Sequence, residues 1–512
     1  MFASRPAPAM PNVILLMTDD QGYGDLGCHG NAILRTPNID RFYGDAVRLT
    51  NFHVSPTCSP TRGALLTGRD TNRVGTWHTI MGRSLLCRDE VTLADLAWGA
   101  GYRTAMFGKW HLGENYPFRP QDRGFHESLT FGGGAIGNAQ DYWGNDLFDD
   151  TYIRNGVPEK VSGYCTDVWF REALRFIAAN RGLPFFLYLP TNAPHRPFVV
   201  PERFSQHYEQ LGIDSPLAEF YGMVENIDEN FGLLLRRLDE LDLADDTIVI
   251  FMTDNGSAMG GRAFNAGMRG AKGSEYEGGH RVPFFIRWAG GGISGGRDID
   301  QLAAHVDVLP TLAELAGVQL PRELELDGSS LVPLLREGVG AWPDRILITD
   351  SQRVDQPVKW RKSAVMQDRW RLINGEELYD LRTDPSQTVD ISREHPGKVA
   401  RLRQAYEDWW AGLEPSLSRY ARIVLGSERK NLHGSRLTTS TARSRGCSHR
   451  YKRASTAMGI GRSMWTKRGC TRSGCAAGLL KLTVRLVKSG PPAEQMPRRS
   501  PDRSLRRFPG PG

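Results

Sequence analysis

Three short apolar runs constrain the fold of this chain more than any other feature of its sequence. They lie at residues 12–17, 185–189 and 247–253, and the first and third lead directly into acidic and other turn-forming residues. Runs of this length and composition are typical of strands buried on both faces. Helical periodicity lies between them, at 91–101 and 219–241. Strands that alternate with helices predict a mainly parallel α/β sheet covered on both faces.

Polar residues follow two of these predicted strands. Asp19 and Asp20 come after the first run, and Asp254 and Asn255 come after the third. Each pair alone is typical of a turn or a helix cap. Ligands of parallel sheets bind beyond the carboxyl ends of the strands, so the two pairs together predict one shared site. A site of oxygen donors without sulfur or imidazole favours Ca²⁺ or Mg²⁺.

The texture of the sequence changes near residue 345. Short runs at 346–349, 360–366 and 370–373 indicate antiparallel strands, and a helix is expected at about 398–413. We therefore predict a large α/β domain over 1–345 and a small α+β subdomain over 346–430.

The last segment, 431–512, differs sharply in charge from the rest. It carries 18 Lys/Arg and 2 Asp/Glu, whereas 1–430 carries 46 and 56. A disordered basic tail is one interpretation. Out-of-frame translation is the other, and the abrupt change of charge favours it. No aromatic-interleaved or recognition motif accompanies the basic residues, so no nucleic-acid partner is expected.

The most specific motif is Cys-Ser-Pro-Thr-Arg at 58–62, followed by Leu-Thr-Gly-Arg at 66–69. Pro60 restricts the backbone, and the Arg62 cation is expected to lower the thiol pKa of Cys58 or to hold an oxyanion. An ordinary cysteine at a helix start is the alternative. The motif resembles the signature of the type I, formylglycine-dependent sulfatases, with Thr where that family more often has Ser.

Two further strings carry basic side chains. Gly-Lys-Trp-His-Leu-Gly at 108–113 contains Lys109 and His111, which would point the same way on an extended segment. His195 stands between two prolines, which exclude a helix and indicate a loop. A surface pair and a loop cap are the respective alternatives. Both strings match the sulfatase family.

Lys272 lies in a glycine-rich segment, 269–279, and glycine lets the backbone approach an anion closely. A mobile surface loop is the alternative. His280 follows where the family more often has an apolar residue, and no role is assigned to it. Segment 131–150 is rich in Gly, Asn, Asp and aromatic residues, a composition suited to sugars.

The resemblance covers about residues 12–425. It implies an alkaline phosphatase-like fold, with a central mostly parallel mixed sheet between helices and a small C-terminal α+β subdomain. It implies hydrolysis of an aryl or carbohydrate sulfate ester, so the expected substrate is a sulfated small molecule or a sulfated glycan. Cys58 would be oxidised to Cα-formylglycine (3-oxoalanine) by a formylglycine-generating or sulfatase-maturating enzyme.

The resemblance also implies a role for each matching side chain. One divalent ion, usually Ca²⁺ with Mg²⁺ as the alternative, would be held by the formylglycine and by Asp19, Asp20, Asp254 and Asn255. The transferring sulfate would be surrounded by the metal and by Arg62, Lys109 and Lys272. His195 would give a proton to the leaving group, and His111 would help to deprotonate the hydroxyl that ejects sulfate.

Two rival functions remain open. The first is a phosphonate monoester or phosphodiester hydrolase on the same fold, and the second is a non-catalytic metal- or glycan-binding relative. Aryl sulfates and phosphodiesters distinguish the first, and an unmodified Cys58 would indicate the second.

The cysteines and the N-terminal residues indicate what to expect for disulfides, zinc binding and localisation. The seven cysteines include no CxxC pair, and no Cys/His ligands stand at zinc spacing, so neither a disulfide framework nor a zinc site is expected. Cys28, Cys87 and Cys165 are interpreted as reduced, buried thiols. No apolar run is long enough to cross a bilayer, and the run at 13–17 is too short for a signal peptide. The chain as written is expected in the cytoplasm, or in the periplasm or outside the cell if its true start lies elsewhere.

Overall fold

The computed structural model describes residues 10–336, 342–425 and 464–465 of the chain. Its centre is a ten-stranded sheet in the order β11-β2-β10-β9-β1-β8-β4-β5-β6-β7. Its strands are β1 (Asn12–Thr18), β2 (Val47–Leu49), β4 (Arg103–Gly108), β5 (Glu127–Thr130), β6 (Thr151–Arg154), β7 (Val157–Lys160), β8 (Phe185–Pro190), β9 (Thr247–Thr253), β10 (Phe284–Arg287) and β11 (Asp298–Ile299).

The five central strands, β9-β1-β8-β4-β5, are parallel, and antiparallel pairs extend the sheet on both sides. β1 lies between β9 and β8, and Leu15 is paired with Ile250 on one side and with Tyr188 on the other. The three strands predicted from apolar runs are confirmed to within one residue at each end. They form the middle of the sheet because most of their side chains on both faces are apolar and can be buried.

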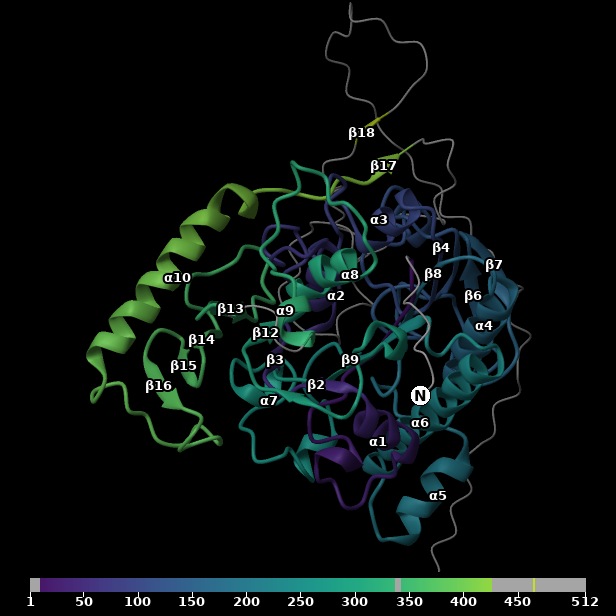
Figure 1. Cartoon of the computed structure of the whole chain (residues 1–512), viewed down its shortest axis with the longest axis horizontal. Helices are drawn as coiled ribbons and strands as arrows, with labels where there is room; N and C mark the ends of the chain where they lie inside the picture. The colour runs from purple at the N-terminus through teal and green to yellow at the C-terminus, as the bar shows by residue number, and fades with distance from the viewer. Residues whose placement is uncertain (1–9, 337–341, 426–463, 466–512) are drawn as a thin grey trace, which may run out of the picture. The chain divides into compact units, whose positions relative to one another are not determined.

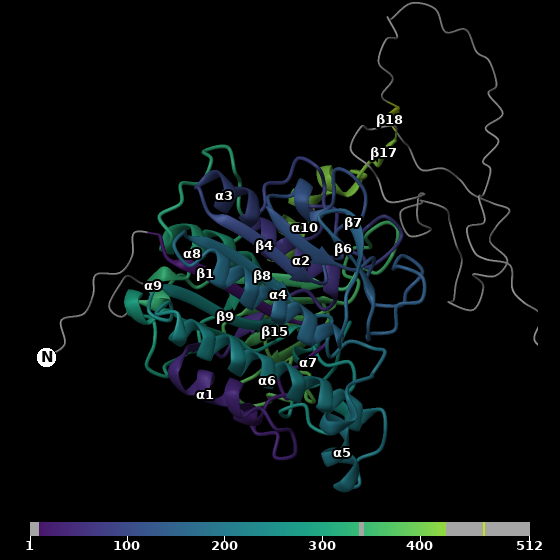
Figure 2. The same ribbon diagram turned by 90° about the vertical axis from the view of Figure 1, so that its right-hand side faces the viewer.

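Helices cover both faces of this sheet. The α-helices of the described residues are α1 (Pro37–Asp45), α2 (Cys58–Thr67), α3 (Leu93–Gly99), α4 (Cys165–Ala179), α5 (Glu202–Gln210), α6 (Leu217–Glu240), α7 (Glu277–His280), α8 (Val308–Leu315), α9 (Val332–Leu335) and α10 (Pro396–Leu417), of which α10 packs on a second, smaller sheet instead. The helices predicted at 91–101 and 219–241 correspond to α3 and α6. Figure 2 shows α4 and α6 running across one face of the sheet.

Alternate residues of β1 enter two separate cores. Val13, Leu15 and Met17 pack with α2, α3 and α8 on one face. Ile14 and Leu16 pack with α1, α4 and α6 on the other. Full burial of one such side chain stabilises the fold by about 1.5–3 kcal/mol. The apolar run therefore fixes β1 between two helical layers, and the polar residues that follow it lie at the edge of the sheet.

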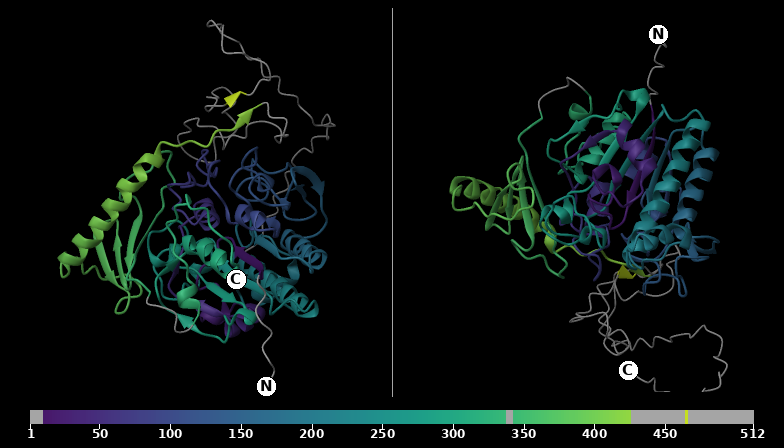
Figure 3. Two further views of the ribbon diagram at one scale, coloured as in Figure 1. Left: turned by 45° about the horizontal axis from the view of Figure 1, so that its top comes forward. Right: turned by 90° about the horizontal axis from the view of Figure 1, so that it is seen from below.

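A second sheet follows in the chain and packs beside the first (Figures 1 and 3, green). It consists of β13 (Ile346–Asp350), β14 (Ser363–Gln367), β15 (Trp370–Ile373) and β16 (Glu377–Asp380), all antiparallel, and α10 covers it. The small C-terminal sheet and its helix are thus confirmed. β14 begins three residues later than predicted, because Trp360 stacks on Tyr406 of α10 with ring centroids 3.6 Å apart and lies outside the strand.

Side-chain contacts tie this small sheet to the loop that carries Lys272. Tyr276 donates a hydrogen bond to Glu377 at 2.8 Å, and Arg269 donates to the backbone oxygen of Gln387 at 2.9 Å. The small sheet and the segment after it are thereby fixed to the loop that carries Lys272.

The remaining elements are short. β3 (Phe52–His53) pairs with β12 (Ala303–Ala304), and β17 (Val424–Leu425) pairs with β18 (Met464–Trp465). The interpretations of segment 431–512 fall outside the described residues, apart from 464–465. Among the described helices, none has the length and apolar character that a membrane span requires. Cys28, Cys58, Cys87 and Cys165 are free thiols; Cys87 and Cys165 are buried as expected, whereas Cys28 is half-buried.

Candidate active site

The two polar pairs that follow β1 and β9 meet at the carboxyl end of the sheet. Thr18 and Thr253 are paired in the parallel register, so the residues after them emerge side by side. The Asp20 backbone N–H donates to Asp254 Oδ1 at 3.1 Å, and Asn255 Nδ2 donates to Asp20 Oδ1 at 2.9 Å. The structure therefore brings together Asp19, Asp20, Asp254 and Asn255, all of which are buried.

This donor set fits a hard cation. It offers three carboxylates and one amide oxygen, and that oxygen, Asn255 Oδ1, is buried without a hydrogen-bond partner in the described part of the chain. Burial and the nearby Asp19 carboxylate raise the pKa of Asp254 to about 6. Buried carboxylates that raise one another's pKa favour a divalent ion among them, and oxygen ligands are those that Ca²⁺ and Mg²⁺ prefer. We find the residues present compatible with such an ion.

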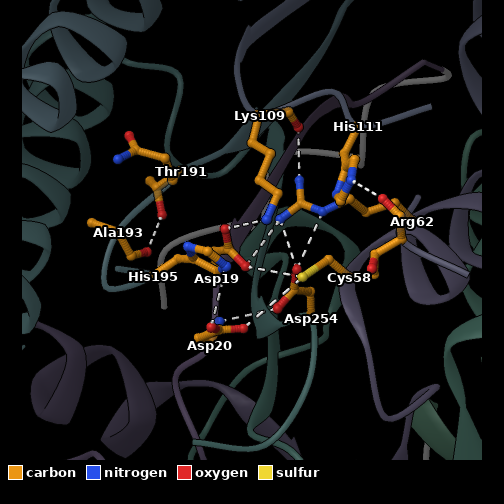
Figure 4. Close-up of polar contacts among 12 residues, drawn as sticks. Asp19, Asp20, Cys58, Arg62, Lys109, His111, Thr191, Ala193, His195 and Asp254 are labelled. Carbon is orange, nitrogen blue, oxygen red and sulfur yellow. Dashed lines mark hydrogen bonds and ion pairs between the residues drawn. The ribbon is translucent and has the colours of Figure 1, made fainter. Parts of the chain in front are cut away.

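Cys58 is the first residue of α2 and lies against these carboxylates (Figure 4). Its Sγ is 3.5 Å from Asp19 Oδ1 and 3.4 Å from Lys272 Nζ. Burial raises the thiol pKa to about 12, and this outweighs the lowering by Lys109 and Lys272. Neighbouring cations thus lower the thiol pKa as expected, but burial reverses the net shift.

Arg62 does not line the cavity beside Cys58. Its guanidinium is fully buried, with Nη2 2.8 Å from Asp254 Oδ2 and Nη1 2.7 Å from the backbone oxygen of Lys109. These bonds use its donors on protein groups, so the prediction that Arg62 surrounds the transferring group requires correction. Arg62 is a positioning residue that fixes the Asp254 carboxylate and the Lys109 backbone relative to each other (Figure 4).

Lys109 and His111 leave the end of β4 and reach the site by different routes. Lys109 Nζ donates to Asp19 Oδ2 in a fully buried ion pair. His111 has φ +57°, so the segment is not extended as predicted, because the chain turns sharply after β4. His111 Nε2 lies 2.9 Å from the Thr79 backbone oxygen, which can only accept, so Nε2 carries the proton.

The other ring nitrogen of His111 is free to act as a base. Its Nδ1 is buried and has no hydrogen-bond partner in the described ranges. Burial holds the pKa of His111 well below its usual value, and Lys109 and Arg62 lower it further. The ring is therefore neutral and carries a lone pair on Nδ1.

His195 and Lys272 both contact Asp20. His195 Nδ1 donates to the Arg196 backbone oxygen at 2.7 Å, which leaves Nε2 3.6 Å from Asp20 Oδ2. Lys272 Nζ donates to the same carboxylate at 2.7 Å. Burial lowers the pKa of His195 to about 3 despite Asp20. The pKa of Lys272 is raised although burial opposes it, because Asp20 and Cys58 lie beside the ammonium.

A cavity of about 330 Å³ opens above these groups. Its floor contains Cys58, His111, His195 and Lys272, and its outer wall contains Thr79, Asn138, Gln140, Arg196 and Arg353. Sequence reasoning missed most of this wall. Asn138 and Gln140 fall within 131–150, whose composition was suggestive, whereas Arg353 follows β13 in no recognisable motif.

Comparisons with known proteins agree with this geometry. The sulfatase family model matches residues 11–318, and the model described as N-sulphoglucosamine sulphohydrolase, C-terminal, matches 271–405. Human N-acetylgalactosamine-6-sulfatase is 34% identical over 357 residues, which cover 65% of this chain and 67% of that protein. Human arylsulfatase A is 34% identical over 364 residues, which cover 66% of this chain and 70% of that protein.

Solved structures share the fold. The crystal structure of Ps i-CgsB in complex with k-i-k-neocarrahexaose superimposes with a TM-score of 0.72 at 27% identity and covers 81% of this chain and 95% of that one. The phosphonate monoester hydrolase of Agrobacterium radiobacter has a TM-score of 0.57 at 22% identity and covers 79% and 95%. The alkaline phosphatase-like fold expected from the sequence is thereby confirmed. The chain belongs to the sulfatase family and is a sulfuric ester hydrolase.

Proposed function

We propose that this sulfatase hydrolyses sulfate esters of carbohydrates, using a formylglycine made from Cys58 and one Ca²⁺ ion. The position of Cys58 is the observation that carries this proposal. It lies between carboxylates and Lys272 at the cavity floor, yet its pKa of about 12 leaves it a protonated thiol. A thiol held protonated by burial is a poor nucleophile, and the proposed modification would replace it with the hydroxyls of an aldehyde hydrate.

The two absent groups have separate tasks. The hydrate of formylglycine would supply one hydroxyl for attack on sulfur and a second whose deprotonation would allow sulfate to leave. Asp19, Asp20, Asp254 and Asn255 would hold a divalent ion, which would lower the pKa of a neighbouring hydroxyl and neutralise charge on the sulfate. Ca²⁺ suits these four ligands because all of them are oxygen atoms, and Mg²⁺ is the alternative.

The side chains of this protein bind the sulfate and move the protons. Lys109 and Lys272 place two positive charges beside Cys58, where the oxygens of the transferring group would lie. His111 accepts a proton on its unpartnered Nδ1. His195 donates a proton from Nε2 to the leaving oxygen, since its Nδ1 is held by Arg196. A bound sulfate anion favours the protonated ring and offsets the lowering of the His195 pKa by burial.

The outer wall of the cavity favours a sugar as the leaving group. Asn138 and Gln140 offer amide groups that match sugar hydroxyls. Arg353 makes no hydrogen bond or ion pair with the residues that the structure describes, so its guanidinium is available to a second anionic group, such as a carboxylate or another sulfate. The names of N-acetylgalactosamine-6-sulfatase and of the neocarrahexaose complex also refer to sugars.

The modification of Cys58 is tested by peptide mass. When the protein is made together with a formylglycine-generating enzyme, the tryptic peptide containing Cys58 should lose about 18 Da, the difference between a thiol and an aldehyde side chain. The peptides containing Cys87 and Cys165, which are also buried, serve as controls and should keep their thiol mass. An unchanged Cys58 beside a converted reference sulfatase would contradict the proposed nucleophile.

The converted protein should hydrolyse 4-nitrophenyl sulfate faster than bis(4-nitrophenyl) phosphate, and the Cys58→Ala variant should hydrolyse neither. A preference for the phosphodiester would make this chain a phosphodiester hydrolase on the sulfatase fold. Absence of turnover on aryl and sugar sulfates by fully converted protein would favour the binding-protein alternative.

Removal of one proposed metal ligand tests the cation. Asn255→Ala deletes an oxygen donor without leaving a buried cation unpaired, so the Ca²⁺ dissociation constant should rise at least about 10-fold, the lower end of the effect of losing a supporting group around a metal. Isothermal titration of chelator-treated protein measures it. Asn12→Ala is the matched control, since Asn12 is buried at the opposite end of β1. Equal affinities in the two variants would place the cation elsewhere.

The role of His195 predicts a dependence on the leaving group. The His195→Ala variant should lose about 10²–10⁴ in kcat/KM on a sugar sulfate, whose alkoxide needs a proton, because that is the usual contribution of a general acid. The loss should be far smaller on 4-nitrophenyl sulfate, whose leaving group is stable as an anion. Equal losses of kcat/KM on both substrates would mean that His195 binds the substrate but does not protonate the leaving group.

Arg353 predicts the charge of the substrate. The Arg353→Met variant should raise KM about 10- to 100-fold for a sugar sulfate that bears a second anionic group, as expected for loss of a charge-assisted hydrogen bond. KM for 4-nitrophenyl sulfate should not change. Arg382→Met, an exposed arginine of the same small subdomain outside the cavity lining, is the control. No effect on any anionic sugar sulfate would remove Arg353 from substrate recognition.

A further inference from the structure

A second cluster of metal-ligating side chains lies outside the catalytic cavity. It contains His53 of β3 and Glu277 and His280 of α7, and one potential ligand atom from each lies within 4.8 Å of the others. All three side chains are at most 1% exposed. None of them lines the cavity above Cys58.

Hydrogen bonds fix where each imidazole carries its proton. His280 Nε2 lies 3.1 Å from the backbone oxygen of Glu275, which can only accept. His53 Nε2 lies 2.8 Å from Asn51 Oδ1. That amide is oriented by its other bonds, because Arg371 donates to Oδ1 and Nδ2 donates to a backbone oxygen. Arg371 Nη2 also lies 3.3 Å from His53 Nε2, but the shorter contact with Asn51 Oδ1, which can only accept, requires a proton on that nitrogen. Both rings therefore carry the proton on Nε2 and a lone pair on Nδ1.

These two lone pairs face each other. The Nδ1 atoms of His53 and His280 are 2.9 Å apart. Glu277 Oε2 is buried beside them without a hydrogen-bond partner among the described residues, while Oε1 accepts from Arg371 Nε at 2.7 Å. Three electron-pair donors thus converge with no hydrogen between them, which is unfavourable unless a cation lies there.

The cation is either a shared proton or a metal ion. Burial lowers the pKa of both His53 and His280, although Glu277 opposes this, so an additional proton is held weakly. A borderline metal such as Zn²⁺ prefers imidazole nitrogen together with carboxylate oxygen. Two nitrogens around one tetrahedral Zn²⁺ lie about 3.3 Å apart, since each bond is about 2.0–2.1 Å long, so the pair needs to open by only a few tenths of an ångström.

We propose that His53, His280 and Glu277 form a second metal site, selective for Zn²⁺ or a similar transition-metal ion and separate from the oxygen-lined catalytic site. The surroundings resemble those of metal-bound histidines, whose far nitrogen usually donates to a carbonyl or amide oxygen, as those of His53 and His280 do here. The positive charges of Arg371 and Arg281 lie near Glu277 and oppose the binding of any cation that is attracted by charge alone. Selectivity therefore comes from the two imidazoles, which Ca²⁺ and Mg²⁺ do not prefer.

The ion would act as a structural brace behind the catalytic residues. The segment between His53 and Cys58 already contacts the Lys272 loop through Val54 N to His280 O and Gly273 N to Pro56 O, each at 2.8 Å. A metal bonded to His53 and to α7 would fix these two segments to each other. Arg371 extends the same contact to β15 of the small sheet.

Metal uptake by the full chain tests the proposal. All proteins carry Cys58→Ser, so that the active-site thiol contributes no ligand, and are stripped with a chelator and then titrated with Zn²⁺ and with Co²⁺. The Cys58→Ser protein should bind one more equivalent than Cys58→Ser/His280→Leu and should show the visible Co²⁺ absorption of a low-coordinate nitrogen and oxygen site. Equal uptake by the two proteins would overturn the proposal.

Two controls separate a lost ligand from a damaged fold. His305→Gln alters another buried histidine, which bonds to Ser55 and belongs to no ligand cluster, and should retain the additional equivalent. Asn255→Ala should retain it as well, because the two sites share no residue. If His280→Leu does not fold, the melting temperature of the Cys58→Ser protein decides. The melting temperature of the Cys58→Ser protein should increase with Zn²⁺ concentration more than that of Cys58→Ser/Glu277→Gln. Equal increases would mean that the two histidines share a proton and bind no metal ion.

Discussion

The buried charge cluster at the carboxyl ends of β1 and β9 is the constraint on which the rest of the structure depends. Asp19, Asp20 and Asp254 are removed from water, and their charges are met by Arg62, Lys109 and Lys272. An unpaired carboxylate in such a place would cost several kcal/mol, so each cation must be held where it is. Parallel pairing of β1 with β9 brings the acids together, while helix α2 delivers Arg62 and three loops deliver Lys109, Lys272 and His195. The fold thus keeps three carboxylates together by pairing each with a cation, and their oxygens form the set that would hold a divalent ion.

The same cluster surrounds Cys58, the proposed nucleophile, whose thiol pKa is raised by burial. Electrostatic lowering of its pKa by Lys109 and Lys272 is outweighed by burial and by the neighbouring aspartates. Those aspartates also supply the oxygen ligands that a divalent ion would need. In the proposed mechanism, such an ion would promote deprotonation of an oxygen nucleophile made from Cys58. Arg62 is buried behind the site and orients Asp254 and the Lys109 backbone.

The sequence predicted the central strands well because their apolar runs match the environment of those strands, which are buried on both faces. The runs that became β1, β8 and β9 are apolar on both faces, and no other environment suits them. It predicted that the polar pairs after β1 and β9 meet, because strand ends of a parallel sheet lie at one edge. The resemblance to sulfatases added the other side chains of the site. The sequence did not predict the direction of the Arg62 side chain, the sharp turn at His111 or the start of β14 after Trp360, since each depends on packing between distant segments. The limits of the domains at 345 and 430 remain predictions.

The cluster of His53, Glu277 and His280 shows why zinc spacing is an incomplete guide. The two histidines are 227 residues apart in the chain, so no short pattern relates them, and the rule that excluded a zinc site considers only ligands near one another in sequence. They meet because β3 leads into Cys58 and α7 follows the Lys272 loop, and both segments must approach the same carboxylates. The small subdomain joins them there through Arg371 and reaches the catalytic cavity through Arg353. A boundary near residue 345 therefore divides the chain in sequence, while the site and its support are built from both sides of it.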